Sequence, residues 1–104
     1  MVLMELSVVP VGAGESIGQH VAKCVDIIDR SGLDYQLHAT GTIVEGELNQ
    51  VLDLVRQCME ITIEYTARVI CTVRLDYDGG KRGQLHDNVA RVEQELGRAL
   101  KKTS

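Results

Sequence analysis

The chain has 104 residues, 44% of them hydrophobic, and a formal net charge of -4 at pH 7, which is the composition of a single globular domain spanning residues 1–104. Its only basic clusters, Lys81-Arg82 and Lys101-Lys102, are too short for the basic stripe that nucleic acid or an anionic membrane would need. Three tyrosines are the only aromatic residues, so a stacking platform for single strands is lacking as well.

The sequence contains no run of 18 apolar residues and no basic leader with an apolar core, so we expect neither export nor a membrane span, and a cytoplasmic location. The three cysteines, Cys24, Cys58 and Cys71, are far apart and lack the spacing of metal ligands. We expect them to be free thiols of a reducing compartment, with Cys58 and Cys71 buried.

The first half of the chain has the pattern of a strand, a helix and a hairpin. Residues 2–9 alternate apolar and polar side chains and stop at Pro10, as a strand would. After a glycine-containing turn, Ser16 is predicted to be the N-cap of a helix that ends at Ser31-Gly32. Two further strands, at 33–40 and 42–45, are separated by a break of one glycine that suits a hairpin.

The second half predicts two more helices around a long strand. Gly46 opens the first of these helices, and its inner stripe is expected to consist of Val51, Leu52, Val55, Cys58, Met59 and Thr62. Residues 68–77 form the strand, and 78–83 form a flexible loop. The last helix spans Leu85 to Leu100, with Lys101-Lys102 at the negative end of its dipole.

This order is βαββαβα, and its first six elements are those of the split βαβ, or ferredoxin-like, fold. We therefore predict an α+β domain with a four-stranded antiparallel sheet, two helices on one face of the sheet, and an additional C-terminal helix. The other face is predicted to be bare unless a partner or the third helix covers it.

The predicted bare face is polar in an unusual way, because it mixes small hydroxyls with an amide, an imidazole and charges of both signs. Alternation along the strands assigns to it Glu5, Ser7, Gln36, His38, Thr40, Thr42, Thr72, Arg74 and Asp76. A face that meets only water is one interpretation. The mixture of groups favours a face that meets a second sheet or a polar ligand.

Motifs of enzymes are missing from the sequence, which has no nucleophile elbow, zinc-protease helix, phosphate-binding loop or dinucleotide fingerprint. We expect no catalytic residue, and an enzyme is the third-ranked interpretation. A metal site built from Asp76, Asp78 and His86 would join a strand end, a loop and a helix start, and we expect no metal. His20 and His86 are interpreted as helix-surface residues.

Glu45 has two competing interpretations. It ends a predicted strand just before a helix, where a carboxylate can cap the helix N-terminus. Alternatively it reaches a ligand on the polar face, since a carboxylate can accept a hydrogen bond from the amine of an aminopyrimidine and attracts a cation. Replacement by glutamine would lower stability in the first case and ligand affinity in the second.

An ordered set of short segments resembles the small thiamine-binding protein family, the YkoF-like group. The segments are Met4-Glu5-Leu6-Ser7-Val8-Val9-Pro10-Val11-Gly12, Gly14-Glu15-Ser16, Ser31-Gly32-Leu33-Asp34-Tyr35, Gly41-Thr42-Ile43-Val44-Glu45-Gly46, Arg68-Val69 and Arg74-Leu75-Asp76. The resemblance implies a ferredoxin-like fold that pairs through its sheets into homodimers or homotetramers. It also implies binding of thiamine, or its hydroxymethylpyrimidine part, between subunits without catalysis, with thiamine as a ligand and not a cofactor. One departure is Ala39-Thr40, where the family commonly has a proline and a bulky apolar residue.

Residues and resemblance together predict a ligand-binding homo-oligomer. The residues expected to bind the ligand are Ser7, His38, Thr42, Glu45, Thr72 and Asp76. The alternative is a regulatory or structural ferredoxin-like module whose polar face is only an oligomer interface, and whose ligand is an amino acid, a metal or none. Ile61 and Ile63, which lie off the helix stripes, are expected to add a second contact between copies.

Overall fold

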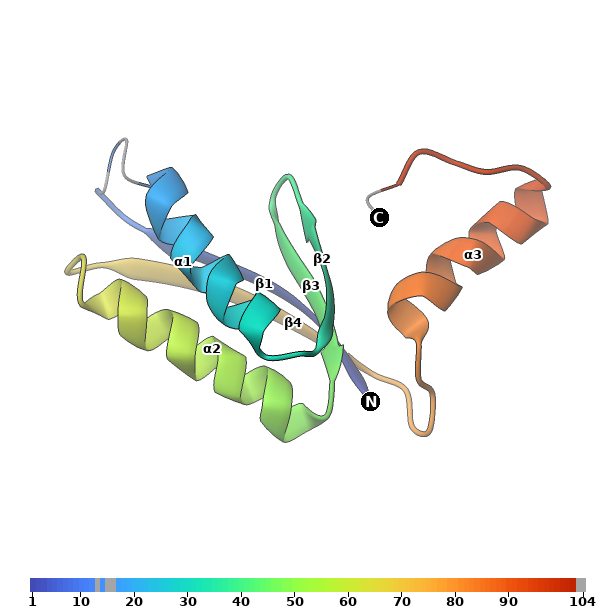
Figure 1. The fold of residues 1–104 in the computed structure, drawn as a ribbon, viewed down its shortest axis with the longest axis horizontal. Coiled ribbons are helices and arrows are strands. Elements are labelled where there is room, and N and C mark those ends of the chain that lie inside the picture. Colours follow the sequence, from blue (N-terminus) through green and yellow to red (C-terminus); the bar gives the residue numbers. More distant parts are fainter. Residues whose placement is uncertain (13, 15–16, 103–104) are drawn as a thin grey trace.

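A computed structural model describes residues 1–12, 14 and 17–102 (Figure 1). Its elements are β1 (Val2–Pro10), α1 (Ile17–Arg30), β2 (Asp34–His38), β3 (Gly41–Gly46), α2 (Leu48–Ile63), β4 (Val69–Tyr77) and α3 (Gln84–Leu96). The strands form one antiparallel sheet in the order β2-β3-β1-β4, and α1 and α2 cover one face of it. The predicted ferredoxin-like fold is confirmed, while the proposed Ser16 cap lies outside the described residues.

The core fills the space between the sheet and its two covering helices. Alternate side chains of β1 point to this side, and all of them are buried, including Met4 at 0% exposure. Val44 of β3 and Val51 and Cys58 of α2 are equally inaccessible. The stripe of α2 differs from the predicted one, because Leu54 is buried and Leu52 is 43% exposed.

Helix α2 begins later than predicted, because Gly46 is the last residue of β3. Glu47 is the N-cap instead and forms a capping box with Gln50, whose Oε1 accepts a hydrogen bond from the Glu47 backbone N–H at 3.0 Å. The box satisfies backbone groups that the first turn leaves free. The start of the helix is therefore set by its own sequence.

Helix α3 ends earlier than predicted. Gly97 adopts a left-handed conformation with φ of 70°, and its N–H donates to the Glu93 carbonyl at 2.9 Å, which closes the helix at Leu96. The chain then folds back, and Lys102 Nζ lies 2.7 Å from the Glu93 carboxylate. The predicted dipole role of Lys101-Lys102 is wrong, since these lysines lie beyond the helix.

The second face of the sheet is largely uncovered by the part of the chain that the structure describes, as predicted. Register places Glu5 opposite Arg74 and Ser7 opposite Thr72 on this open face. Helix α3 projects away from the sheet in Figure 1 and contacts its β2–β3 corner, where His86 Nε2 lies 2.9 Å from the Asp34 carboxylate. Most of the open face is therefore free to meet something else.

Candidate functional site

A notch in the sheet arises because the β2–β3 hairpin is shorter than β1. Strand β1 pairs with β4 along its whole length, from Val2 to Pro10. Its pairing with β3 stops at Leu6, which is opposite Thr42. The stretch of β1 beyond Leu6 therefore has no strand on its β3 side, and side chains from both faces of β1 reach the gap.

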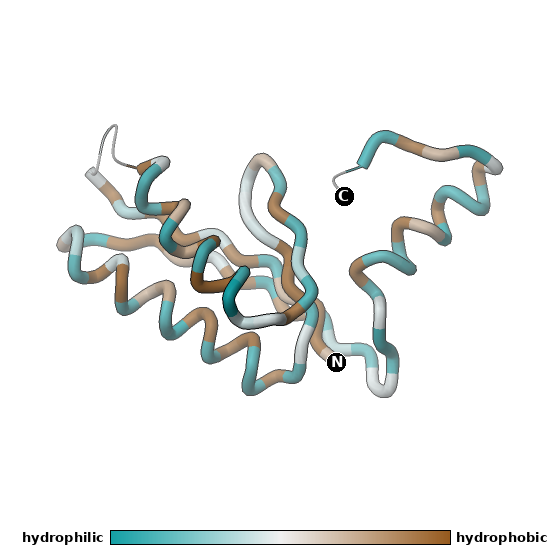
Figure 2. The backbone as a smooth tube through the Cα atoms, viewed as in Figure 1, coloured by the Kyte–Doolittle hydropathy of each residue, from teal (hydrophilic) through white to brown (hydrophobic). Residues whose placement is uncertain are grey.

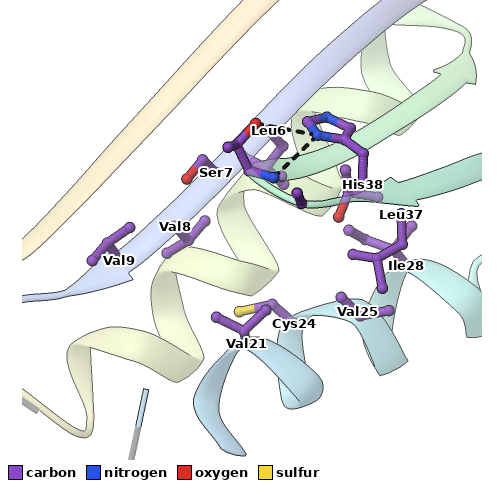
Figure 3. A pocket seen from close by; sticks show the side chains of 14 residues that line it. Leu6, Ser7, Val8, Val9, Val21, Cys24, Val25, Ile28, Leu37 and His38 are labelled. Atoms are coloured by element: carbon purple, nitrogen blue, oxygen red, sulfur yellow. Dashed lines mark hydrogen bonds between the residues drawn. The ribbon is translucent and has the colours of Figure 1, made fainter. Parts of the chain in front are cut away.

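This gap is the end of a cavity of about 290 Å³ between β1, the hairpin turn and α1 (Figure 3). Its apolar wall includes Leu6, Val8, Val21, Val25 and Ile28, and its polar groups are Ser7, His38, Thr40 and Thr42. The small residues Ala39 and Thr40 form the turn at one side of the cavity. A bulky apolar side chain in this turn would take up part of the space.

The His38 ring is fixed by neighbours on both edges. Nδ1 accepts a hydrogen bond from the Thr40 backbone N–H at 3.2 Å, which assigns the proton of the neutral ring to Nε2. Nε2 lies 3.4 Å from the Glu5 carboxylate, close enough for an ion pair but too poorly aligned for a hydrogen bond. The ring is thus held at the rim of the cavity with an acidic group behind it.

Gly41 allows the hairpin to approach β1 this closely. A Cβ at this position would lie 2.8 Å from the Leu6 carbonyl oxygen and 3.5 Å from Cε1 of His38. Because the first contact is with backbone, the strand itself would have to move. Glycine is therefore required here for packing, and its backbone conformation is an ordinary one.

Three of the six predicted site residues, Ser7, His38 and Thr42, line the cavity together. Thr42 reaches it from the helix side of the sheet, where it is buried, so its predicted place on the open face is wrong. The reason is the hairpin turn: His38 pairs with Gly41 and shares a face with it, which leaves Thr42 opposite Leu37 on the other face.

Glu45 lies away from the cavity and is already engaged. Its Oε2 accepts a hydrogen bond from the Gln84 backbone N–H at 2.8 Å, and its Oε1 lies 3.5 Å from the Leu85 N–H. The carboxylate is buried at the N-terminus of α3, where the helix dipole favours negative charge. This geometry supports the capping interpretation, although the capped helix is α3 and not the helix that follows Glu45 directly.

Thr72 and Asp76 are on the open face, as predicted, and both are exposed. Asp76 borders a small hollow of about 70 Å³ that Leu3, Glu5, Ile43 and Arg74 also line. The structure therefore separates the predicted residues into a cavity group, an open-face group and one helix cap.

Sequence reasoning missed the part of the site that α1 supplies. Val21 and Cys24 of α1 line the cavity, yet in the sequence they have only the spacing of a helix stripe. The lengths of the predicted strands could have indicated the cavity. The first strand was predicted to be much longer than the strand 42–45, which pairs with it, and a long strand beside a short one keeps an unpaired edge.

His20 was predicted to be on the surface, and this is wrong: it is 1% exposed. Its ring packs edge-on against Tyr65 with 4.6 Å between centroids, and Lys23 Nζ lies over the same tyrosine ring. Burial lowers the pKa of His20 below its usual 6.5, and the positive charge of Lys23 lowers it further. Among the described residues, neither ring nitrogen of His20 has a hydrogen-bond partner, so its site favours the neutral ring.

Within residues 1–12, 14 and 17–102, no three metal-ligating side chains come together. His86 of the considered metal site forms its close contact with Asp34 instead. Of the predicted buried thiols, Cys58 is buried and Cys71 is half-buried, and both are free. In the same part of the chain, no helix has the length and apolar character needed to cross a membrane.

Fold and cavity together define a small ferredoxin-like α+β protein with a preformed, ligand-sized cavity at one end of its sheet. The profile of the family described as "Thiamine-binding protein" matches residues 4–93. The chain belongs to this thiamine-binding protein family, as its short segments indicated.

The chain is also similar to proteins of known sequence and to solved structures. A UPF0045 protein of Synechocystis is 42% identical over 91% of this chain and 79% of its own length, and one of Mycobacterium bovis is 32% identical over 91% and 94%. A Bacillus cereus domain of unknown function superposes with a TM-score of 0.78 at 26% identity, covering 94% of this chain and 93% of that one. A Thermotoga maritima protein provisionally assigned to thiamine biosynthesis or salvage has the same fold, with a TM-score of 0.76 at 22% identity over 88% of this chain and 97% of its own.

Proposed function

We propose that the chain binds thiamine, or another molecule with its aminopyrimidine ring, in the cavity between β1, the hairpin turn and α1, and that it does so without catalysis. Family membership supports the ligand class. The observation that carries the proposal is the cavity itself, whose volume of about 290 Å³ is near the lower end of the range of about 300–1,000 Å³ for small-molecule pockets.

The lining suits a flat, polar heterocycle. Valine and isoleucine side chains provide apolar walls for the faces of a ring, while hydroxyls and an imidazole surround them. The hydroxyls of Ser7 and Thr42 can each donate and accept, so they can serve the amine and the ring nitrogens of an aminopyrimidine. The Glu5 carboxylate beside His38 adds negative charge on one side, which suits a cationic ligand such as thiamine.

We further propose that the protein is a homo-oligomer, a dimer or tetramer, in which a second copy seats on the open face. Among the described residues, exposed apolar side chains occur on the α3 stripe, where Val92 and Leu96 are about half exposed, and at one end of the open face, where Val9 and Ile70 are exposed. Two copies can exchange these surfaces symmetrically. Because Val9 also lines the cavity, a second copy on this face would border the ligand.

The test compares two threonines that differ only in their location. Thr42→Val removes the cavity hydroxyl and preserves the shape of the side chain, and Thr72→Val does the same on the open face. By calorimetry with thiamine, we expect Thr42→Val to lose about 0.5–1.5 kcal/mol, or roughly two- to twelvefold in affinity, as one neutral hydrogen bond is lost. Thr72→Val should bind as the wild type does.

The opposite result, with Thr72→Val weakened and Thr42→Val unchanged, would place the ligand on the open face. Separate titrations with the hydroxymethylpyrimidine and with the thiazolium half show which part the cavity recognises, and we expect the pyrimidine to bind. If wild-type protein binds neither thiamine nor the pyrimidine at millimolar concentration, the proposed ligand is wrong. The remaining interpretation is then a ferredoxin-like structural module.

A further inference from the structure

Two cysteines face each other where α1 crosses α2. Cys24 of α1 is 6% exposed and Cys58 of α2 is fully buried. The Cys58 sulfur lies 3.7 Å from the Cys24 carbonyl oxygen, and the Cys24 sulfur lies 3.9 Å from the Cys58 carbonyl oxygen. These reciprocal contacts make the two thiols neighbours across the helix crossing.

The two thiols differ in access. Cys24 is part of the wall of the β1–α1 cavity, where Figure 3 shows it between Val21 and Val8. Cys58 is absent from that lining and lies behind it, among core residues. A small reagent that enters the cavity therefore meets Cys24 first.

The two thiols also differ in their tendency to ionise. The pKa of the Cys24 thiol is lowered, chiefly by its interaction with the Cys58 thiol, against the opposing effect of burial. The pKa of Cys58 is raised by the same interaction and by burial. The direction of both shifts agrees with the difference in access, because Cys24, which lines the cavity, is also the thiol whose ionisation is favoured.

We propose that Cys24 and Cys58 form a peroxide-reactive pair, with Cys24 as the attacking thiol and Cys58 as the resolving thiol. The Cys24 sulfur attacks hydrogen peroxide, a sulfur–oxygen bond forms, the oxygen–oxygen bond breaks, and the departing hydroxide takes the Cys24 proton and leaves as water. The Cys58 sulfur then attacks the Cys24 sulfur, the sulfur–sulfur bond forms, the sulfur–oxygen bond of the sulfenic acid breaks, and its hydroxyl leaves with the Cys58 proton as the second water. Two electrons pass from the two thiols to the peroxide.

Such a bond would tie α1 to α2 in the wall of the cavity. The alternative is that the two cysteines have only a packing role, in which their small side chains allow α1 and α2 to approach each other without forming a bond. The third cysteine, Cys71 of β4, provides an internal control, because it is half-buried outside the pair and its pKa is raised, mainly by burial.

The experiment treats folded wild-type protein with hydrogen peroxide and follows intact mass and a peptide map under non-reducing conditions. We expect a loss of two hydrogen atoms and a peptide pair that joins Cys24 to Cys58. Cys71→Ala should give the same product. Cys58→Ala should stop at a sulfenic acid on Cys24, trapped by dimedone, and Cys24→Ala should leave Cys58 unreacted.

Circular dichroism establishes that each variant is folded. The peptide map of the wild-type protein tests the proposal even if a variant fails to fold. The proposal is overturned if folded wild type forms no bond between Cys24 and Cys58 at peroxide levels that oxidise the urea-unfolded chain. It is equally overturned if Cys71 or Cys58 reacts before Cys24.

Discussion

The body of the molecule and its α3 arm are held in place by different forces. The body, β1 to β4 with α1 and α2, shares one core in which Met4 and Val44 are completely inaccessible. In α3 only Gln84 and Leu85 of the first turn are buried, and the apolar stripe that continues through Val92 and Leu96 is about half exposed. Figure 2 shows hydrophobic residues recurring along this helix. The body is therefore held by a shared core, whereas the α3 arm is held at its first turn alone, by the burial of Leu85 and by polar contacts.

The difference indicates what the isolated chain lacks. An amphipathic helix is normally stable because its apolar side is buried. Helix α3 instead depends on the Glu45 carboxylate and the Asp34–His86 contact, both at its N-terminal end. A second copy covering the stripe would supply the missing burial, and the following changes test this contrast.

The largest effect is expected in the body, from Met4→Ala. Truncation of a fully buried methionine leaves a cavity and should lower the free energy of unfolding by about 2–5 kcal/mol. Urea unfolding followed by circular dichroism measures the loss. Leu52→Ala is the control, since this half-exposed leucine of α2 should cost much less; equal losses would show that the core is elsewhere.

In the arm, Val92→Glu should break the oligomer. An unpaired carboxylate buried between copies would weaken association by about 2–4 kcal/mol, roughly 30-fold or more in dissociation constant. Multi-angle light scattering at micromolar concentration should show wild type as a dimer or tetramer and the variant as a monomer. Gln94→Glu, which adds the same charge on the opposite side of α3, should leave the oligomer intact. A monomeric wild type contradicts the proposal.

At the junction between the two regions, Glu45→Gln should loosen the arm alone. Loss of the negative charge at the helix N-terminus should cost about 1 kcal/mol, because a glutamine oxygen still accepts one hydrogen bond without the charge. Hydrogen exchange should rise at Gln84 and Leu85 and stay unchanged in α2, while thiamine affinity is retained. Weaker thiamine binding at wild-type stability would restore the ligand role for Glu45.

The smallest effect is a pH dependence in the body. Because the folded protein lowers the pKa of His20 below 6.5, the unfolded chain binds more protons as the pH falls below that value. The contribution of His20 to the free energy of unfolding is therefore fully present above about pH 6.5 and is lost as the pH falls below that value. His20→Phe, which keeps a ring against Tyr65, should remove this part of the decline in urea titrations at pH 7.5 and 5.5. An unchanged slope would show that His20 does not titrate between the two states.

The periodicity of apolar residues was sufficient to predict the order of the helices and strands. It was less reliable for predicting the face of the sheet or helix on which a given residue lies. Alternation placed Met4 and Ser7 correctly, because β1 is regular along its length. Thr42 was misplaced since its side depends on which residues the turn pairs, and the sequence around Gly41 allows more than one register. Leu52 and Leu54 are both compatible with a helix stripe, and only the crossing with the sheet selects Leu54.

The site was harder to predict than the fold because it depends on distances between elements. The cavity exists since the hairpin ends before β1 does, and its wall comes from a helix that strand patterns do not mention. Glu45 shows the same limit: it was expected to bind the ligand, with a helix cap as the competing interpretation, and the helix it caps begins 39 residues later in the chain. Long-range partners of this kind leave no local signature.

The pairing of β1 with β4 also has a consequence for biosynthesis. Val2 pairs with Tyr77 and Pro10 with Val69, so the first strand to leave the ribosome finds its longest partner only when the fourth has been made. Until then β1 has only the shorter β3 as a partner, which pairs with it from Val2 to Leu6. Distant pairing of this kind is slow and prone to association with other chains. We expect a nascent chain that stops before residue 69 to be held by chaperones, and release to require translation through β4.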